Sequence, residues 1–469
     1  MTGATNMLVI VLDALREDAV GASLEEPGRC VRAETCVATA PWTLPSCTSL
    51  LTGVDAGVHR HFWHSGDLAV PGLVEALPRG MRKVGLVNNT VLQPSSQLDA
   101  GFDKWRYFAD HARPFERAAS LIRRARRRTP LFLLLHSNIS HDYYKPSGGV
   151  YFDEAFPDNA GGACTLGGRV IRWNRTTPEQ RAAVVETYRA SARKVVACAR
   201  EVLELARARD DFVSVVLSDH GEGLDYDDAR VHHGGRLHDD LLRVPLYFDL
   251  PSGTPARQSA DLAARLASAP VATTDVLPTL FALAGVDPVP HVDGRRMDTA
   301  PGERTVVSED RRYLYLKDRF RLNVRGRDTH MSPEDREQNQ RLQEQLAGPP
   351  LVRSYRSSRA KLIMTCLHLR PTAGPPSEAR RGLVEFGERL LGSPTLALYG
   401  DHLVAFEWYD LGADPGEHDN LLAGAGAGVR ALAQSEWAPS VTVPVDGRAG
   451  GAEMDLTTFL EGAEAVSSP

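Results

Sequence analysis

The sequence lacks the features that mark several common protein classes. No apolar run is long enough to span a bilayer, and the segment before Met7 lacks the basic start and apolar core of a signal peptide. The six cysteines form no Cys-x-x-Cys pair, so a zinc knuckle or a thioredoxin-like site is not expected. A formal net charge of -6 gives no support to nucleic-acid binding. We therefore expect a cytoplasmic protein with no nucleic-acid and no membrane partner.

The cysteines fit that compartment as reduced thiols. Cys30 and Cys36 lie close enough in the sequence to form a bridge, but only in an oxidising environment. Hydrophobic residues make up 42% and charged residues 24% of 469 residues, which is typical of a globular protein with more than one core. The pattern of elements weakens beyond residue 326. We expect a catalytic domain over residues 1–325, a smaller subdomain over 326–425 and a loosely ordered tail over 426–469; nothing indicates the oligomeric state.

Four apolar runs predict strands that are buried on both faces, as in a parallel sheet. They are residues 7–12, 83–87, 131–135 and 212–217. Helix-like stretches separate them, at residues 73–77, 115–127 and 178–208. Strands that alternate with helices predict an α/β fold with a doubly wound sheet. Past residue 326, residues 362–369 and 396–408 predict strands of a smaller sheet, and residues 332–346 an exposed helix or insertion.

Polar side chains stand where each of the four strands ends. They are Asp13, Asn88, His136 and Asp219. Open α/β sheets bind their ligands beyond the carboxyl ends of the strands. We therefore expect these four segments to converge on one crevice.

Residues 40–53 read APWTLPSCTSLLTG. This segment resembles the one that carries the nucleophile in sulfatases, and the resemblance implies a helix that begins near Thr43. Backbone N–H groups and the helix dipole stabilise negative charge at a helix N-terminus, which suits a nucleophile that receives a phosphoryl or sulfuryl group. The alternative is that Thr43 only caps the helix. The segment resembles the nucleophile segment of the sulfatase family in the alkaline phosphatase superfamily, with Thr43 at the nucleophile position. The resemblance implies an alkaline-phosphatase-like sheet, a smaller C-terminal α+β subdomain and ester hydrolysis.

Thr43 and Cys47 depart from the sulfatase pattern. Sulfatases oxidise Cys or Ser to formylglycine, an aldehyde that Thr cannot give, and the Arg of their motif is replaced by Cys47. A Thr nucleophile resembles instead the phosphodiesterases, nucleotide pyrophosphatases and lipoteichoic-acid synthases of the superfamily. This favours a phosphate-type ester over a sulfate ester. A Thr hydroxyl needs a metal ion to act as an alkoxide at neutral pH.

Two further segments resemble the metal-binding segments of the family. VIVLDALRED at residues 9–18 contains Asp13, and LSDHGE at residues 217–222 contains Asp219 and His220. With Thr43, these residues offer carboxylate, hydroxyl and imidazole ligands, which favour Mn²⁺ or Zn²⁺, with Ca²⁺ and Mg²⁺ as alternatives. Ala14 replaces a second family Asp, which reduces support for Ca²⁺, and one ion is favoured. The alternative is a polar loop after a buried strand.

Two histidine-containing segments also resemble the family. HSNISHDYYKP at residues 136–146 implies that His141 faces the substrate, with His136 nearby. VHHGGRLHDDLLRVPL at residues 231–246 implies that His233 binds the transferred anion, with His232 as a shifted alternative. Imidazoles can protonate a leaving group, although loop histidines can also be merely solvated. Asn88 stands where arylsulfatases carry the Lys and His that grip sulfate, and we expect it to donate a hydrogen bond to substrate.

We therefore interpret the chain as a metal-dependent hydrolase of a small anionic ester, acting through a covalent Thr43 intermediate. The predicted catalytic residues are Thr43, His141 and His233. The predicted substrate-binding residues are His136, Asn88 and His232, and the predicted metal ligands are Asp13, Thr43, Asp219 and His220. Two alternatives stay open: a phosphoryl or sulfuryl transferase that uses the same intermediate, and a non-catalytic member that only binds an anion.

Overall fold

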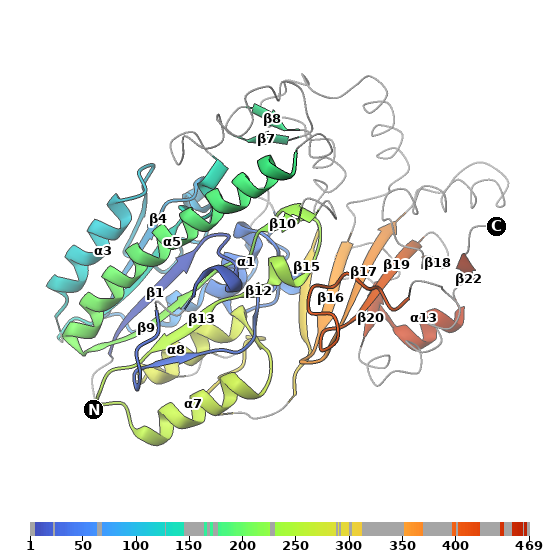
Figure 1. Cartoon of the computed structure of the whole chain (residues 1–469). Helices are drawn as coiled ribbons and strands as arrows, with labels where there is room; N and C mark the ends of the chain where they lie inside the picture. The colour runs from blue at the N-terminus through green and yellow to red at the C-terminus, as the bar shows by residue number, and fades with distance from the viewer. Residues whose placement is uncertain are drawn as a thin grey trace. The chain divides into compact units, whose positions relative to one another are not determined.

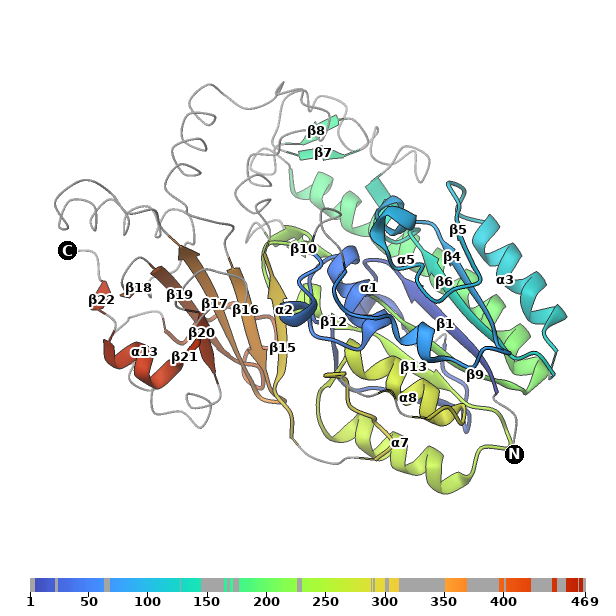
Figure 2. The same ribbon diagram turned by 180° about the vertical axis from the view of Figure 1, so that it is seen from behind.

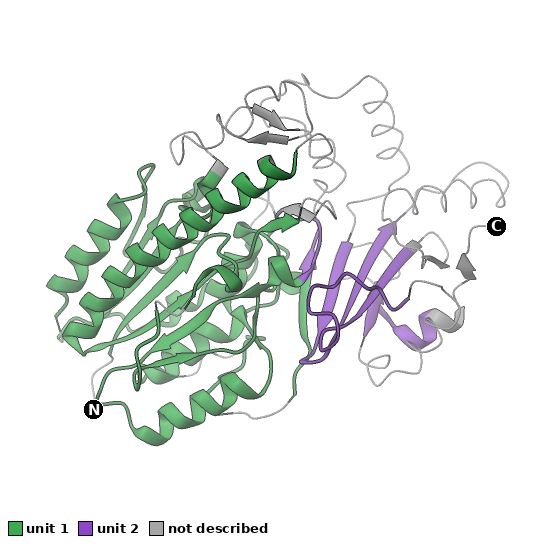
Figure 3. Ribbon diagram, viewed as in Figure 1, with its two compact units in different colours: residues 1–161, 165–234, 239–308 green, residues 162–164, 235–238, 309–469 purple. Residues whose placement is uncertain are grey.

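The structure, a computed structural model, forms two compact units. Residues 1–161, 165–234 and 239–308 make up the first, and residues 162–164, 235–238 and 309–469 the second (Figure 3). The described residues are 5–21, 24–62, 68–126, 128–144, 164–166, 169–171, 177–225, 230–287, 289, 292–299, 303–311, 351–368, 396–399, 402–422, 441–444, 453–462 and 464–466. This division differs from the predicted 1–325, 326–425 and 426–469, and regular elements occur in the described parts of 426–469.

A seven-stranded mixed sheet forms the centre of the first unit, in the order β2-β13-β9-β1-β6-β4-β5 (Figure 1). Its strands are β1 (Asn6–Leu12), β2 (Cys30–Arg32), β4 (Arg82–Val87), β5 (Lys104–Tyr107), β6 (Leu131–Ser137), β9 (Phe212–Leu217) and β13 (Leu246–Asp249). The four predicted strands are confirmed as β1, β4, β6 and β9, and β1 is buried along its whole length. Only β13 runs antiparallel to its neighbours β9 and β2.

Helices cover both faces of this sheet (Figures 1 and 2). On one face lie α3 (Arg113–Arg124) and α5 (Pro178–Arg209); on the other lie α7 (Ala256–Ser268) and α8 (Val276–Leu283). Helix α5 buries Val184, Tyr188, Ala192 and Val195, a three-to-four-residue spacing that places one apolar stripe against the sheet. The predicted helices at 115–127 and 178–208 are confirmed. The stretch at 73–77 forms a single 3-10 turn, Leu73–Ala76, because it is too short for a stable α-helix.

The strand register brings the predicted site residues to one edge. On central strand β1, Val11 lies opposite His136 of β6 on one side and opposite Leu217 of β9 on the other. Parallel strands end at the same edge of a sheet, so the residues that follow β1 and β9 emerge beside each other. The predicted convergence of these strand ends is therefore found in the fold.

The second unit contains a six-stranded sheet in the order β15-β16-β17-β19-β18-β22. Its strands are β15 (Val306–Asp310), β16 (Leu351–Arg356), β17 (Ala360–His368), β18 (Leu396–Tyr399), β19 (His402–Asp410) and β22 (Glu464–Val466). The predicted strand at 362–369 is confirmed as β17. The segment predicted at 396–408 is two antiparallel strands, β18 and β19.

The other described α-helices and strands have two to ten residues each. They are β3 (Cys36–Val37), α1 (Thr43–Thr52), α2 (Ala56–His59), β7 (Cys164–Leu166), β8 (Arg169–Ile171), β10 (Gly223–Asp225), β11 (Arg230–His232), α6 (Asp239–Leu242), β12 (Arg243–Val244), β14 (Val271–Ala272), β20 (Thr442–Pro444), β21 (Glu453–Asp455) and α13 (Leu456–Gly462). The segment at 332–346 lies outside the described residues. Cys30 and Cys36 are free thiols. No described helix is both long and apolar enough for a membrane span.

Candidate active site

Helix α1 presents Thr43 as its first residue. The N-cap is Trp42, whose side chain makes no capping hydrogen bond, so Thr43 does not serve as the cap. The Thr43 side chain is buried, and its Oγ1 lies 3.5 and 3.3 Å from the two carboxylate oxygens of Asp13 and 3.3 Å from His220 Nε2. The helix ends at Gly53, whose φ of 68° is the left-handed conformation that glycine adopts without strain. The hydroxyl therefore points into the cluster formed by the strand ends.

Asp13 is held in place by the turn that follows β1. Ala14 adopts a left-handed conformation with φ 56°, and its N–H donates to Asp219 Oδ1 at 3.2 Å. The hydroxyl of Ser140 donates to the main-chain carbonyl of Asp13 at 2.6 Å. A strained residue kept at such a position is typical of functional sites. The turn ties the ends of β1 and β9 together through one carboxylate.

The chain turns sharply at Asp219 and His220, as the glycine at 221 predicts. The N–H of Gly221 donates to Leu241 O at 2.7 Å, and a Cβ on Gly221 would lie only 2.1 Å from Asp240 O, so a side chain cannot fit there. His220 Nδ1 lies 2.8 Å from Gly221 O. This contact requires a proton on Nδ1 and leaves Nε2 as the atom that faces Asp13 and Thr43.

Asp13, Asp219 and His220 form a buried group whose ligand atoms all lie within 4.8 Å of one another. Asp13 and Asp219 contact amide, hydroxyl, thiol and imidazole groups, and no Lys or Arg side chain among the described residues. Two buried carboxylates without a fixed cation are costly unless a bound ion compensates them. The ligand types and the uncompensated charge both fit a divalent metal ion.

The ionisation of this group reflects competition between burial and neighbouring charge. Burial raises the pKa of Asp13, but the imidazoles of His141, His220 and His136 outweigh it and hold that pKa below its usual range. Burial lowers the pKa of His220, but the carboxylates of Asp219 and Asp13 outweigh it and raise the pKa to about 9. Without a metal ion, the imidazolium of His220 would therefore offset part of the charge of these carboxylates.

Asn89 lies in the site, whereas the side chain of its neighbour Asn88 supports the backbone. Asn89 Nδ2 donates to Asp13 Oδ2 at 2.6 Å and lies 3.4 Å from Thr43 Oγ1. Asn88 Nδ2 donates to Phe108 O at 2.7 Å, and Asn88 Oδ1 lies 2.6 Å from His111 Nδ1. Sequence reasoning therefore missed Asn89. The Asn-Asn pair after a buried strand was the available signal, but it did not show which side chain turns inward.

His141 and His233 lie beside the metal-ligand group. The ring of His233 lies 4.6 Å from that of His220 and 4.9 Å from that of His141, measured between centroids. The β10–β11 hairpin pairs Gly223 with His232 and so returns the chain to this place, where His233 Nδ1 lies 3.1 Å from Glu222 Oε2. His232 ends β11, and its side chain is outside the described structure. His136 Nε2 lies 3.5 Å from Asp13 Oδ2.

Comparisons with known proteins agree with this fold. The family model described as Sulfatase matches residues 37–286. The comparison with curated proteins finds no match. Among solved structures, a 2-O GAG sulfatase shares 18% identity and a TM-score of 0.58, with 95% of this chain and 96% of the other covered.

Two other solved structures have the same fold. The phosphonate monoester hydrolase of Agrobacterium radiobacter shares 16% identity and a TM-score of 0.57, with 99% and 100% of the two chains covered. A protein solved in complex with its substrate D-glucosamine-2-N,6-O-disulfate shares 12% identity and a TM-score of 0.51, with 92% and 96% covered. The family match spans more than half of the 469 residues. The chain therefore belongs to the sulfatase family, whose members bind divalent metal ions, and it is a hydrolase of ester bonds.

Proposed function

We propose that this hydrolase cleaves a small anionic ester, with a phosphate-type ester favoured over a sulfate ester, through a covalent intermediate on Thr43. The observation that carries the proposal is the position of the Thr43 hydroxyl. It lies at the first turn of a buried helix, within 3.5 Å of Asp13 and 3.3 Å of His220. A Thr cannot form the aldehyde that sulfatases make from Cys or Ser, so a hydroxyl nucleophile is the chemistry left to this position.

A divalent ion held by Asp13, Asp219, His220 and Thr43 would lower the pKa of the Thr43 hydroxyl and neutralise charge on the reacting group. Mn²⁺ and Zn²⁺ suit this mixture of oxygen and imidazole ligands best. The Thr43 side chain is held against Asp13 and His220, and Asn89 donates to Asp13 from the other side. These contacts fix the direction of the hydroxyl, which is the geometric requirement for in-line attack.

The reaction then has two steps that conserve atoms and charge. In the first, a bond forms between Thr43 Oγ1 and phosphorus while the bond to the leaving oxygen breaks, and an imidazolium proton passes to the leaving oxygen. In the second, water hydrolyses the Thr43 ester, which restores the hydroxyl and releases the acid. The hydroxyl proton of Thr43 leaves to solvent before the attack. In the second step the imidazole that gave up its proton takes one from the attacking water, and Thr43 regains a proton from solvent, so both groups return to their starting state.

His141 and His233 are the proposed proton donors and anion ligands. Burial lowers the pKa of His141, but the carboxylates of Asp13 and Asp142 outweigh it, so the net pKa is raised and the protonated form is favoured. His141 Nδ1 lies 3.0 Å from Asp142 Oδ1, which fixes the orientation of its ring. His233 is oriented in the same way by Glu222. A carboxylate behind each imidazole therefore supports a role in general acid catalysis.

The test is a rate panel on the purified chain. Phosphate monoesters, phosphate diesters, phosphonate esters and sulfate esters are each offered with Mn²⁺, Zn²⁺, Ca²⁺ and Mg²⁺, and Thr43→Ala supplies the background rate. We expect the highest kcat/KM for a phosphate-type ester with Mn²⁺ or Zn²⁺. Sulfate esters that exceed every phosphorus ester would overturn the substrate preference. A rate unchanged in Thr43→Ala would overturn the covalent mechanism, and added alcohols that capture the transferred group would identify a transferase.

A further inference from the structure

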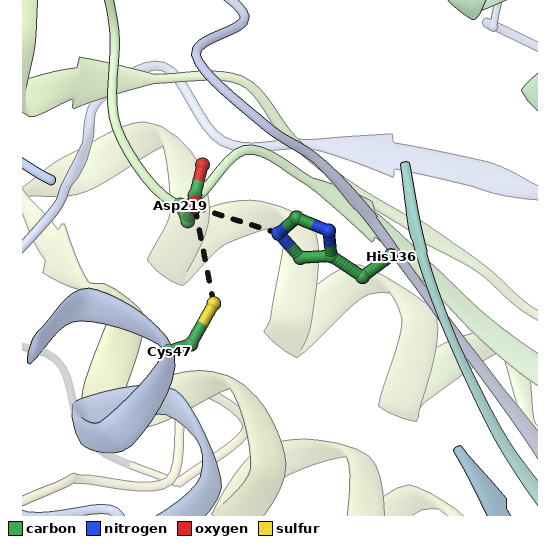
Figure 4. A group of neighbouring side chains, drawn as sticks. All are labelled: Cys47, His136 and Asp219. Carbon is green, nitrogen blue, oxygen red and sulfur yellow. Dashed lines mark hydrogen bonds and ion pairs between the residues drawn. The ribbon is translucent and has the colours of Figure 1, made fainter. Parts of the chain in front are cut away.

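A second group of buried ligand atoms lies beside the proposed metal site. It shares one carboxylate with that site, and its thiol and imidazole take no part in the mechanism above. It consists of Cys47 on α1, His136 on β6 and Asp219 after β9, which are 3%, 1% and 2% exposed. Figure 4 shows the thiol and the imidazole both directed at the Asp219 carboxylate. Three elements that are far apart in the sequence thus deliver three different ligand types to one point.

The distances within the group are somewhat longer than the edges of a metal coordination tetrahedron. Cys47 Sγ lies 3.8 Å from Asp219 Oδ2, and His136 Nε2 lies 3.6 Å from the same oxygen. All three ligand atoms lie within 4.8 Å of one another. Typical zinc–ligand bonds place tetrahedral neighbours about 3.3 to 3.5 Å apart. A small inward movement of the side chains would therefore complete three corners of a zinc site.

His136 provides an independent indication that a ligand belongs here. Neither of its ring nitrogens has a hydrogen-bond partner among the described residues, although the side chain is 1% exposed. The contacts of Nε2 with Asp13 and Asp219, at 3.5 and 3.6 Å, are too long for hydrogen bonds. Buried polar groups are nearly always satisfied, and an exception calls for an unseen partner such as a bound ion. The unpartnered imidazole faces the carboxylate and the thiol.

The surroundings of Cys47 and His136 exclude water from one side. Both residues line a small cavity whose six other lining side chains are all apolar, among them Leu50, Leu134 and Trp105. A free thiol in such a place is merely a small apolar group, but a thiol next to an acidic oxygen and an imidazole has the composition of a zinc ligand set. An apolar wall strengthens the attraction between a cation and its anionic ligands.

We propose that Cys47, His136 and Asp219 form a second metal site, for a thiophilic divalent ion such as Zn²⁺, and that Asp219 bridges it to the ion held by Asp13, Thr43 and His220. The bridging role of Asp219 rests on the proposed function, because it needs an ion at the catalytic site. The site formed by Cys47, His136 and Asp219 does not depend on that function. On binding, the Cys47 S–H bond gives way to a sulfur–metal bond and one proton leaves to solvent. The sequence predicted one metal ion, whereas this proposal places two ions next to each other.

The experiment uses the full chain, stripped with a chelator and reloaded with Co²⁺ as a spectroscopic probe for Zn²⁺. A thiolate bound to Co²⁺ gives an intense near-ultraviolet charge-transfer band. We expect this band, about two ions per chain by metal analysis, and proton release on loading. Cys47→Ala should lose the band and one ion. Cys36→Ala, which removes another buried thiol of the first unit, should keep both.

If Cys47→Ala does not fold, the spectrum of the unmutated protein still shows whether a thiolate binds the metal. Cys47→Ser is a second variant, in which the new side chain is closer in size to cysteine. A Co²⁺-loaded protein without a thiolate band would overturn the second site, and so would a band that survives in Cys47→Ala. The Thr43→Ala variant separates this result from the proposed function. It should lose turnover and keep the thiolate band, so that each proposal can fail without the other.

Discussion

Two buried carboxylate regions of the first unit differ in how the chain compensates them. The carboxylate of Asp275 accepts hydrogen bonds from the main-chain N–H groups of Ala272 and Arg295 at 2.9 and 2.7 Å. It also accepts from Arg304, whose Nη1 lies 2.5 Å from both oxygens. Asp13 and Asp219 are equally buried but contact no guanidinium or ammonium group among the described residues. A buried charge that the chain itself neutralises is structural, whereas one left to hydroxyl, thiol and imidazole groups marks a place for a ligand.

The largest expected effect comes from Thr43→Ala at the uncompensated region. Removing the hydroxyl removes the proposed nucleophile, so we expect kcat to fall by about four orders of magnitude or more. Circular dichroism and thermal unfolding should show an intact fold, because Thr43 is not the cap of α1. Thr52→Ala is the matched control, since Thr52 is a buried threonine of the same helix whose hydroxyl donates to Thr48 O and accepts from the Val54 N–H. Comparable activity in the two variants contradicts the covalent mechanism.

Arg304→Ala should break the compensated region. It leaves the Asp275 carboxylate buried without its cation, which costs about 3 to 5 kcal/mol in the free energy of unfolding.

Asp219→Asn in metal-free protein should instead be neutral or stabilising. It removes a buried charge and keeps an oxygen for the N–H groups of Ala14 and His220. Urea unfolding of both variants in the presence of a chelator measures the difference, and equal losses in the two variants would erase the distinction between the regions.

Metal removal should destabilise the unmutated protein and spare Asp219→Asn. A ligand at about a hundredfold its Kd stabilises the folded state by about 3 kcal/mol, and a chelator removes that stabilisation. The measurement is the Tm of each protein with Mn²⁺ or Zn²⁺ and then with excess chelator. If the Tm of both proteins falls equally, the ion that is removed is not held by this carboxylate.

Asn89→Ala and Asn88→Ala should have opposite signatures. Asn89 donates to Asp13 and so positions a proposed metal ligand. Loss of such a contact typically lowers metal affinity or activity by roughly tenfold to a hundredfold. Asn88 bonds to Phe108 O, so its loss should lower stability with little change in kcat. Metal titration and kcat on both variants test this assignment. It is wrong if Asn88→Ala is the variant that loses metal.

Asp55 offers a smaller test at the edge of the compensated region, where it accepts a hydrogen bond from Thr274. Burial and then the neighbouring Asp293 raise its pKa to about 6. A carboxyl group with a raised pKa binds its proton more tightly in the folded state than in the unfolded state. The free energy of unfolding therefore falls as the pH rises from the unfolded pKa of about 4 to the folded pKa of about 6. Asp55→Asn should therefore gain about 1 to 2 kcal/mol over the unmutated protein between pH 4 and pH 7. Urea midpoints across that range check the sign, and parallel curves would refute it.

The sheet and its strand ends were predictable because each central strand is a continuous apolar run that stops at a polar residue. Asp13, Asp219 and His220 could be named from such positions, and the structure gathers them around Thr43. Asn89 could not be separated from Asn88, because successive residues after a strand point to opposite sides and a single-residue shift exchanges them. The contact of Cys47 and His136 with one carboxylate depends on how α1 packs beside β6 and β9, which no local pattern encodes.

Residue types and their order are therefore enough to name groups that meet at the candidate site: a hydroxyl at a helix start, carboxylates and an imidazole at strand ends, and a glycine where the chain must turn. Local propensity and apolar periodicity act over a few residues, so they can be read along the chain. Which side chains are left buried without a counter-charge is decided only when distant segments pack together. Arg304 neutralises the charge of Asp275, whereas no described Lys or Arg side chain neutralises Asp13 or Asp219. This difference depends on which side chains are neighbours in space.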